Sequence, residues 1–392
     1  MKTLAIISEF NPFHNGHKYL LNKSKYLTKS DVSISFMSGD FVQRGEPAIL
    51  EKYERADISL NEGFDIVFEM PCFISLQSAY FFAYNSIKIL NKLNVNYLAF
   101  GIENLSEKEF LEIANYIIIN DSKINKSISE FIKLGYSYSK SSMMAINKIS
   151  GRDDFITSNN ILALEYMRSI RKTKSNIIPI PIKRKSTNNK DNFLREDGFA
   201  SSTAIRNNLN DSNLESYLPK YSFSKIKKSI ENNSIITFED FFDIFYYKIY
   251  TENKKMNDVF GYEDGMYNLF FKNLKNYSSF EDFFKDNLST RYTKSRMKRL
   301  IINYLLDNKT YLNSIDINFV NLLSFNKTST KYILKIKDNI NIINSKKDYD
   351  RLDKINKIAY NRILKSSNLY HQFDNKIINK DFIIKRQIKD YH

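Results

Sequence analysis

EFNPFHNGHKYL, residues 9 to 20, is the stretch that decides the fold, since it joins a short apolar run to an amphipathic pattern. The run LAII at 4–7 predicts a strand, and apolar residues at helical spacing from about 17 to 27 predict a helix. Between them, two of the four histidines in the chain, His14 and His17, flank Gly16. In a parallel sheet, the loop after the first strand binds ligands, and the next helix directs unsatisfied N–H groups toward them. The order strand, loop, helix therefore predicts an anion site here.

The same alternation continues along the first half of the chain. Further strands are predicted at 31–37, 65–70, 96–101 and 177–184, and helical patterns at 49–63, 78–93, 107–148 and 159–172 lie between them. Strands that alternate with helices at this spacing form parallel sheets with right-handed crossovers. The predicted fold class is therefore α/β, a doubly wound, Rossmann-like parallel sheet, followed by a mainly α-helical basic domain.

The chain is long enough for two domains, and its charge is distributed unevenly between them. Residues 1–215 carry 27 Lys and Arg against 24 Asp and Glu, whereas residues 216–392 carry 32 against 20. We expect 1–215 to be the catalytic domain and 216–392 to be a helical domain. A basic excess of this size attracts polyanions. Lys-rich helix faces that only keep a protein in solution would give the same excess of Lys and Arg over Asp and Glu.

The composition also limits where the protein works. The single cysteine, Cys72, cannot form an internal disulfide and is expected to be a small buried thiol in a reducing compartment. The best candidate for a membrane span, DIVFEMPCFISLQSAYFFAYN, is interrupted by Glu69 and Gln77. We therefore expect a cytoplasmic protein without a membrane partner, and the sequence does not predict its oligomeric state.

His14 and His17 have the chemistry of phosphate ligands. Two imidazoles in an H-x-G-H arrangement can both donate hydrogen bonds to a phosphoryl group, and Gly16 lets the backbone approach closely. This favours nucleotidyl transfer, in which charge develops on the α-phosphate of a nucleoside triphosphate as pyrophosphate leaves. A zinc pair is disfavoured because the first half offers no further soft ligand except Cys72, so no metal site is expected.

The segment SSTAIR, residues 201–206, predicts a second phosphate contact about 185 residues later. The hydroxyls of Ser202 and Thr203, with the backbone N–H groups of a helix start, can bond phosphate, and Arg206 adds charge. Alone, this segment would be only a capped helix. Paired with HNGH, it resembles the two-signature arrangement of the HxGH nucleotidyltransferase superfamily.

The resemblance narrows to one family, the bacterial tRNA(Met) cytidine acetate ligases. It is carried by the runs EFNPFHNGH, MSGDFVQRGEPAILEKYERA, FEMP, QSAYFFA, FGIEN, NNILALEY, PIKR and SSTAIR, and more weakly by RYTKSRMKRLIINYLLD and FNKTSTKYILKIK. The resemblance implies a ligase that forms acetyl-adenylate from acetate and ATP, with Mg²⁺ accompanying the nucleotide. It then implies transfer of the acetyl group to N4 of the wobble cytidine of elongator tRNA(Met).

The same resemblance implies the roles of individual residues. His14, His17 and Arg206 would be catalytic. The ATP-binding residues would be Ile7, Ser8, Glu9, Phe10, Asn11, Pro12, Phe13, His14, Asn15, Gly16, His17, Lys18, Tyr19, Leu20, Gly101, Asn159, Arg184, Ser202 and Thr203. Asn160 could take the place of Asn159, and this choice stays open.

The basic half offers one stripe for tRNA in RYTKSRMKRL. The residues expected to contact the tRNA backbone are Arg291, Lys294, Arg296, Lys298 and Arg299, unless they form only a solvated helix face. Gln43 and Arg44, after the second strand, are expected to face the acetate or the cytidine. Two other functions stay open: a nucleotidyltransferase that joins an NMP to a phosphorylated small molecule, and a nonenzymatic RNA-binding protein.

Overall fold

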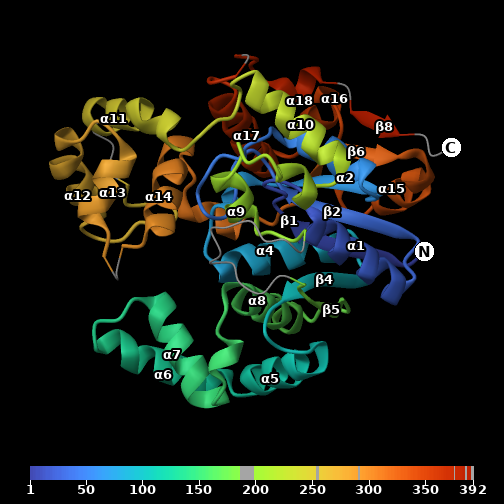
Figure 1. Cartoon of the computed structure of the whole chain (residues 1–392), viewed down its shortest axis with the longest axis horizontal. Helices are drawn as coiled ribbons and strands as arrows, with labels where there is room; N and C mark the ends of the chain where they lie inside the picture. The colour runs from blue at the N-terminus through green and yellow to red at the C-terminus, as the bar shows by residue number, and fades with distance from the viewer. Residues whose placement is uncertain (186–197, 253–255, 290–291, 375, 385, 390–392) are drawn as a thin grey trace.

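The computed structural model of the chain describes residues 1–185, 198–252, 256–289, 292–374, 376–384 and 386–389. One mixed β-sheet forms its centre, with helices on both faces and a group of helices standing beside it (Figure 1). The strands are β1 (Thr3–Ser8), β2 (Val32–Ser38), β3 (Ile66–Met70), β4 (Tyr97–Ile102), β5 (Ile178–Lys183), β6 (Phe319–Asn326), β7 (Asn341–Ile343) and β8 (Gln387–Lys389). Their order is β5-β4-β1-β2-β3-β6-β7, and β8 pairs with β6.

The first five strands confirm the predicted parallel sheet. β1 pairs in parallel with both β2 and β4, β2 with β3, and β4 with β5. Every residue of β2 and β3 is buried, as expected for strands covered by helices on both faces. The chain order reverses beside β1, so the loop that follows β1 opens at the switch point of the sheet.

The first half of the chain surrounds this sheet with helices. They are α1 (Asn15–Thr28), α2 (Lys52–Asn61), α3 (Cys72–Ser75), α4 (Ala79–Lys92), α5 (Glu107–Ile119), α6 (Asp121–Lys133), α7 (Tyr138–Ser150), α8 (Ser158–Lys172) and α9 (Ser202–Asn207). Helices α5 to α7 are inserted between β4 and α8, and α6 and α7 project below the sheet in Figure 1.

The second half begins with helices and then returns to the sheet. Its helices are α10 (Lys220–Glu231), α11 (Phe242–Thr251), α12 (Met266–Asn273), α13 (Phe280–Asn287), α14 (Lys294–Leu306), α15 (Thr330–Ile336), α16 (Lys346–Asp350), α17 (Lys354–Tyr370) and α18 (Lys380–Ile383). Helices α11 to α14, here called the helical subdomain, share a core that includes Phe245, Phe270 and Phe283. No helix within the described residues combines the length and the apolar character needed to cross a membrane.

The return to the sheet was not anticipated by the sequence pattern. β6 pairs antiparallel with β3, and β7 and β8 follow it in parallel. The expected boundary between residues 215 and 216 stays a prediction, but the sheet itself extends across it. In the sequence, the helical subdomain therefore lies between two groups of strands that belong to the same sheet.

A buried charge cluster fastens the end of the chain to the first half. Lys52 Nζ lies 2.9 Å from Glu69 Oε2 and 2.6 Å from Asp381 Oδ1, and all three side chains are buried. Asn321 of β6 donates to both carboxylates. Because removal of one member of a buried ion pair costs about 3–5 kcal/mol, the cluster fixes α18 against α2 and β3.

Candidate active site

The histidine pair forms the start of α1. His14 is the N-cap residue, and its Nδ1 accepts a hydrogen bond from the Gly16 N–H at 3.0 Å. His17 Nδ1 accepts in turn from the His14 N–H at 3.3 Å, and the two rings stack with centroids 3.7 Å apart. A neutral imidazole that accepts at Nδ1 carries its proton on Nε2. The pair therefore presents two Nε2–H donors held by one capping box.

Gly16 is required by this arrangement. A Cβ atom at position 16 would lie 2.8 Å from His14 Cε1, which is closer than van der Waals contact allows. Any side chain there would displace the capping imidazole. The absence of a side chain at Gly16 thus allows His14 to take its capping position and also allows a ligand to approach the backbone.

Burial keeps both imidazoles neutral. Burial, with His17, Arg184 and Arg206 nearby, lowers the pKa of His14 well below its usual value. Burial and Arg184 lower the pKa of His17 to about 3. Near neutral pH the pair consequently donates hydrogen bonds without carrying charge. The positive charge of the site is supplied by arginines, including Arg184 and Arg206.

Arg206 connects the two sequence motifs in space. Helix α9 begins after Ser201, whose side chain accepts from the Ala204 N–H at 3.0 Å. From the second turn, Arg206 Nη1 donates to the Asn11 carbonyl at 2.7 Å, across 195 residues of sequence. Its Nη2 lies 3.5 Å from Glu46, and burial lowers its pKa, although guanidinium remains charged in proteins.

Arg184 approaches from the other side of the histidines. It follows β5, and its side chain packs over Gly101, where a Cβ atom would lie 3.2 Å from Arg184 Cγ. Its Nη1 lies 3.4 Å from Glu103, a long distance for a charge-assisted hydrogen bond. Gly101 thus leaves the space that the Arg184 side chain occupies at the end of β4.

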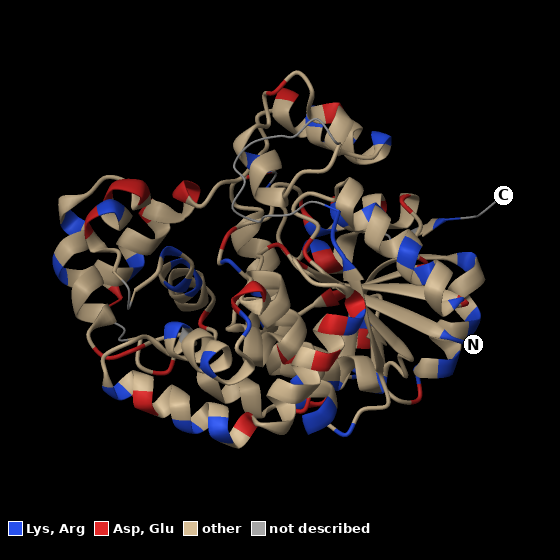
Figure 2. Ribbon diagram, turned by 60° about the horizontal axis from the view of Figure 1, so that its bottom comes forward, with Lys and Arg blue, Asp and Glu red and all other residues tan. Residues whose placement is uncertain are grey.

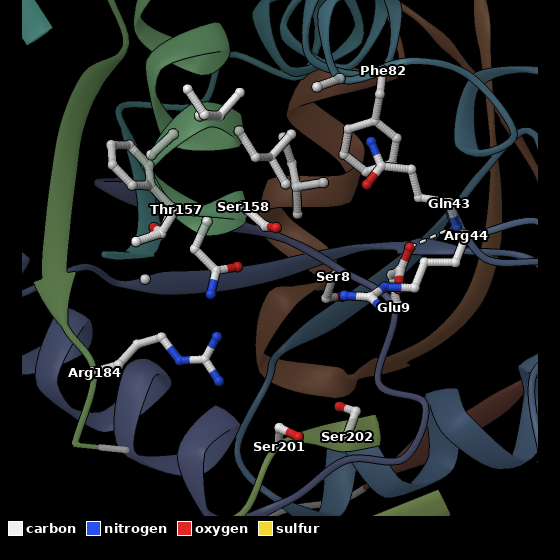
Figure 3. Close-up of a pocket in the computed structure, with 18 of the residues that line it drawn as sticks. Ser8, Glu9, Gln43, Arg44, Phe82, Thr157, Ser158, Arg184, Ser201 and Ser202 are labelled. Carbon is white, nitrogen blue, oxygen red and sulfur yellow. Dashed lines mark hydrogen bonds between the residues drawn. The ribbon is translucent and has the colours of Figure 1, made fainter. Parts of the chain in front are cut away.

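These groups line one cavity of about 710 Å³. Figure 3 shows Arg184, Thr157 and Ser158 on one side of it, Glu9, Gln43 and Arg44 on the other, and Ser201 and Ser202 between them at the base. The predicted residues that line the cavity are Ile7, Ser8, Glu9, Phe10, His14, Gly16, His17, Tyr19, Leu20, Gly101, Asn159, Arg184, Ser202, Thr203 and Arg206. The two motifs therefore meet at a single site.

The other predicted nucleotide residues lie behind the cavity wall. Asn11 and Phe13 are buried in the loop, together with Pro12, and the Asn11 side chain accepts from the Ile49 N–H. Asn15 donates to the carbonyls of Gly198 and Ser216, and Lys18 pairs with Glu62 at 2.7 Å. These residues shape and anchor the loop.

Comparisons with known proteins identify the family. A model of the HIGH Nucleotidyl Transferase family matches residues 1–382. The tRNA(Met) cytidine acetate ligase of Caldicellulosiruptor saccharolyticus is 35% identical over 89% of this chain and 88% of that protein. That of Clostridium acetobutylicum is 36% identical over 86% and 87%.

The chain belongs to the tRNA(Met) cytidine acetate ligase family.

Solved structures agree with this assignment. The apo crystal structure of Thermotoga maritima TmcAL superposes with a TM-score of 0.90 at 27% identity, covering 100% of both chains. A structure of the same protein bound with alpha-thio ATP gives a TM-score of 0.88 at 26% identity, again over 100% of both. The chain thus shares its fold with these two structures along its full described length.

Asn159 and Asn160 have different surroundings in this family member. Helix α8 is capped by Thr157, so neither asparagine is its N-cap. Asn160 is buried and exchanges hydrogen bonds with the backbone of Glu103 at 2.8 and 3.0 Å. Asn159 lines the cavity and donates to Glu103 Oε1 at 2.6 Å. Asn159 is therefore the asparagine of the two that faces the cavity.

The side of the cavity opposite Arg184 is built around Glu9. Its carboxylate accepts from the Gln43 N–H at 2.6 Å, and burial raises its pKa against the effect of nearby arginines. Figure 3 shows the Arg44 guanidinium extending toward Ser8 and Glu9. Fully buried Arg55, which the sequence reasoning missed, donates to the carbonyls of Glu9 and Ser38 and so joins the ends of β1 and β2.

Helix α14 forms part of the cavity wall, which the sequence did not indicate. Thr293, Ser295 and Arg299 line the cavity, and Arg299 Nη1 lies 3.4 Å from the Gln43 carbonyl. Burial lowers the pKa of Arg299 to about 10. A Cβ at Gly45, where φ is 79°, would lie 2.4 Å from the Arg299 nitrogen, so the 42–46 turn rests directly on this helix.

The predicted tRNA stripe is only partly open to solvent. Lys294 is exposed, whereas Arg296 pairs with Glu263 and buried Lys298 lies 2.7 Å from Glu46. Arg291 lies outside the described residues. Figure 2 shows Lys and Arg interspersed with Asp and Glu along the helices of both halves.

Proposed function

We propose that the chain activates acetate with ATP and transfers the acetyl group to N4 of the wobble cytidine of elongator tRNA(Met). The observation that carries this proposal is the convergence of two neutral imidazole donors and two arginines on one cavity at the switch point of the sheet. Family membership adds the identity of the substrates, because the relatives are tRNA(Met) cytidine acetate ligases.

The cavity divides naturally into a nucleotide side and an acceptor side. Gly101, Asn159 and Arg184 come from β4, α8 and β5, and would contact the adenosine and the phosphates. His14, His17 and Arg206, with Ser202 and Thr203 at the start of α9, would hold the triphosphate at the centre. Glu9, Gln43 and Arg44 come from the β1 and β2 ends and would face the acetate.

In the first step an acetate oxygen would attack the α-phosphorus, and the bond to the departing pyrophosphate would break. The two Nε2–H groups would stabilise the charge that develops on the α-phosphate, while Arg206 and Arg184 would hold the pyrophosphate. Arg44 would bring in the acetate carboxylate. The neutral state of the imidazoles suits this role, because a neutral donor needs no proton uptake before catalysis.

In the second step the N4 amine of cytosine would attack the acetyl carbonyl, AMP would leave, and the amine would lose a proton. This amine is a weak nucleophile because its lone pair is delocalised into the ring. Prior activation as a mixed anhydride therefore supplies the good leaving group. The base must be splayed from its stack to reach the cavity, as single-stranded loops allow.

The helical subdomain would bind the tRNA backbone. Lys294 is exposed at the start of α14, and Arg299 of the same helix lines the cavity. The division into a catalytic part, 1–215, and a tRNA-binding part, 216–392, is proposed on this basis. Such an enzyme would act in the cytoplasm, where tRNA is modified.

Mg²⁺ would enter with the nucleotide. Within the described residues, no group of three His, Cys, Asp or Glu side chains could hold a metal ion. We assign Mg²⁺ no protein ligand. In this proposal the ion is coordinated by phosphate oxygens and water, which is its usual environment beside ATP.

The direct test is acetylation of purified elongator tRNA(Met) with acetate and ATP, followed by mass analysis of the wobble nucleoside. We expect N4-acetylcytidine, with AMP and pyrophosphate as products. Pyrophosphate exchange that ignores acetate but proceeds with a phosphorylated small molecule would favour the alternative nucleotidyltransferase. Binding of tRNA without any exchange would favour a nonenzymatic RNA-binding protein.

A further inference from the structure

Two stacked tyrosines stand at the edge of the cavity on α4. The rings of Tyr80 and Tyr84 are nearly parallel, with an interplanar angle of 5° and centroids 6.0 Å apart. Tyr80 lines the cavity together with Ser78 and Phe82. Both rings are only half-buried, and Phe81, 39% exposed, meets Tyr80 edge-on at 5.0 Å. The pair thus presents an aromatic surface beside the reacting groups.

A lysine from α8 completes this surface. Lys172 Nζ lies 5.0 Å from the Tyr80 centroid and 5.1 Å from the Tyr84 centroid, and it donates to the Tyr80 hydroxyl. That hydrogen bond raises the pKa of Lys172, so the amine remains charged. We call Tyr80, Tyr84 and Lys172 the tyrosine shelf. It combines π faces with an exposed positive charge, which is the pairing that single-stranded nucleic acids bind.

Helix α7 adds a further exposed aromatic residue to the cavity lining. Tyr138, at the start of α7, lines the cavity and is 64% exposed. Met143 of the same helix also lines the cavity and is 40% exposed. An aromatic ring left this exposed at the mouth of a cavity is a feature of binding surfaces.

Lys172 of the shelf contacts α4 through Tyr80, but α4 and α8 also pack against each other elsewhere. These helices pack through buried residues of the shared core, including Ala83, Ile87 and Leu164. In the described part of the chain, the ring contacts of the shelf are those within it and the edge of Phe81. Its aromatic faces are therefore not accounted for by core packing.

We propose that the tyrosine shelf stacks a base of the anticodon loop that flanks the reacting cytidine, while Lys172 attracts the adjoining phosphate. Tyr138, which also lines the cavity, would offer a further aromatic contact to the same loop. This inference rests on the proposed function, since it concerns the tRNA substrate of that site. Stacking suits the task because every base has a π face, and it holds the loop open while the cytidine enters the cavity.

The test compares Tyr80→Ala and Tyr84→Ala with three controls. Tyr80→Phe and Tyr84→Phe retain the rings, and Tyr26→Ala removes a tyrosine that is 80% exposed on α1 and outside the cavity lining. Two reactions are measured: acetate-dependent pyrophosphate exchange without tRNA, and acetyl transfer to tRNA. We expect each alanine to raise the KM for tRNA about tenfold. Exchange should stay within about twofold of the wild type, as should transfer by all three controls.

A second readout reports on stacking directly. A tRNA anticodon stem-loop with 2-aminopurine beside the wobble cytidine should lose fluorescence on binding the wild type, and lose much less on binding the double alanine variant. If an alanine variant does not fold, Tyr80→Leu and Tyr84→Leu keep apolar volume without a ring and should give the same KM change.

Three results would overturn the inference. Unchanged KM for tRNA and unchanged fluorescence loss would mean that no base stacks here, and a changed oligomeric mass in the alanine variants would identify the shelf as a protein contact. Equal losses of exchange and transfer would mean that the shelf only supports the fold. Failure of the proposed function can be distinguished from failure of this inference. In that case the wild type itself would lack acetate-dependent exchange, and the inference, which needs the tRNA substrate, would fail as well.

Discussion

The cavity mouth and helix α14 are both rich in basic residues, but they hold their positive charge differently. Arg184 Nη1 lies 3.4 Å from Glu103 and Arg206 Nη2 lies 3.5 Å from Glu46, and both residues line the cavity. On α14, Lys298 lies 2.7 Å from Glu46 and is buried, and Arg296 pairs closely with Glu263. The arginines of the first region bring charge to the cavity lining, whereas α14 uses much of its charge in ion pairs that hold the fold.

This difference teaches that the number of basic residues in a segment does not give the charge it offers to a partner. Glu46 joins the two regions, because it pairs with Lys298 on one side and with Arg206 on the other. Helix α14 therefore supports the 42–46 turn as well as any tRNA contact. Variants that separate these roles test the comparison.

The largest effect is expected when a donor is removed from the cavity mouth. His14→Asn keeps an N-cap side chain but loses the Nε2–H donor. We expect acetate-dependent exchange to fall about 10²–10³-fold, because each fixed donor to a developing phosphate charge contributes on that scale. Radiolabelled pyrophosphate exchange measures it. A variant that keeps more than a tenth of the wild-type rate would mean that His14 acts only as a cap.

Arg206→Lys should have the next largest effect. Lysine keeps the charge but lacks the planar fork with which a guanidinium can bond the Asn11 carbonyl and a phosphate in fixed directions. We expect exchange to fall about 10–100-fold, with circular dichroism unchanged. The matched control is Arg296→Lys on α14, which should leave exchange within about twofold. Equal losses in both variants would remove the distinction between the two regions.

The neutral state of His17 predicts a pH-dependent stability. Its folded pKa, about 3, lies below the unfolded value of about 6.5, so protons bind the unfolded chain first as the pH falls. The stability that the folded protein retains by keeping His17 neutral is complete above about pH 6.5 and is lost progressively below it. Between pH 7 and 5.5, the free energy of unfolding should fall about 1 kcal/mol more in the wild type than in His17→Asn. Urea unfolding curves at both pH values measure this, and parallel losses would mean that His17 is not buried as a neutral base.

The smallest effect is expected on the solvent face of α14. Lys294→Gln removes an exposed charge that pairs with no carboxylate among the described residues. We expect the KM for tRNA to rise about threefold and the salt slope of binding to fall by about one, with exchange unchanged. An unchanged salt slope would show that this face of α14 does not contact the tRNA backbone.

The sequence predicted the parallel sheet well, because each of its five strands is an apolar run bounded by a loop or glycine signal. It also paired HNGH with SSTAIR, through the resemblance to a two-signature arrangement, and the hydrogen bond from Arg206 to the Asn11 carbonyl joins the two segments. It missed β6 because an apolar run does not reveal its pairing partner, which here is β3, far back in the chain. The choice between Asn159 and Asn160 could not be made either, since only the turn of α8 decides which one faces the cavity.

The tRNA stripe shows the same limit at the level of side chains. From the sequence, Lys298 and Arg296 were expected to contact tRNA, but each forms an ion pair within the protein, with Glu46 and Glu263 respectively. Long-range ion pairs leave no periodic signal. Residues such as Arg55, whose role is to bond carbonyls at two strand ends, are invisible for the same reason.

The central claim is that two neutral imidazoles and a distant arginine act on one triphosphate, and a crystal structure with a nonhydrolysable ATP analogue tests it most directly. The account predicts the α-phosphate about 3 Å from the Nε2 atoms of His14 and His17, with Arg206 on the phosphates beyond it. A nucleotide bound elsewhere, or bound with both Nε2 atoms directed away from its phosphates, would contradict it.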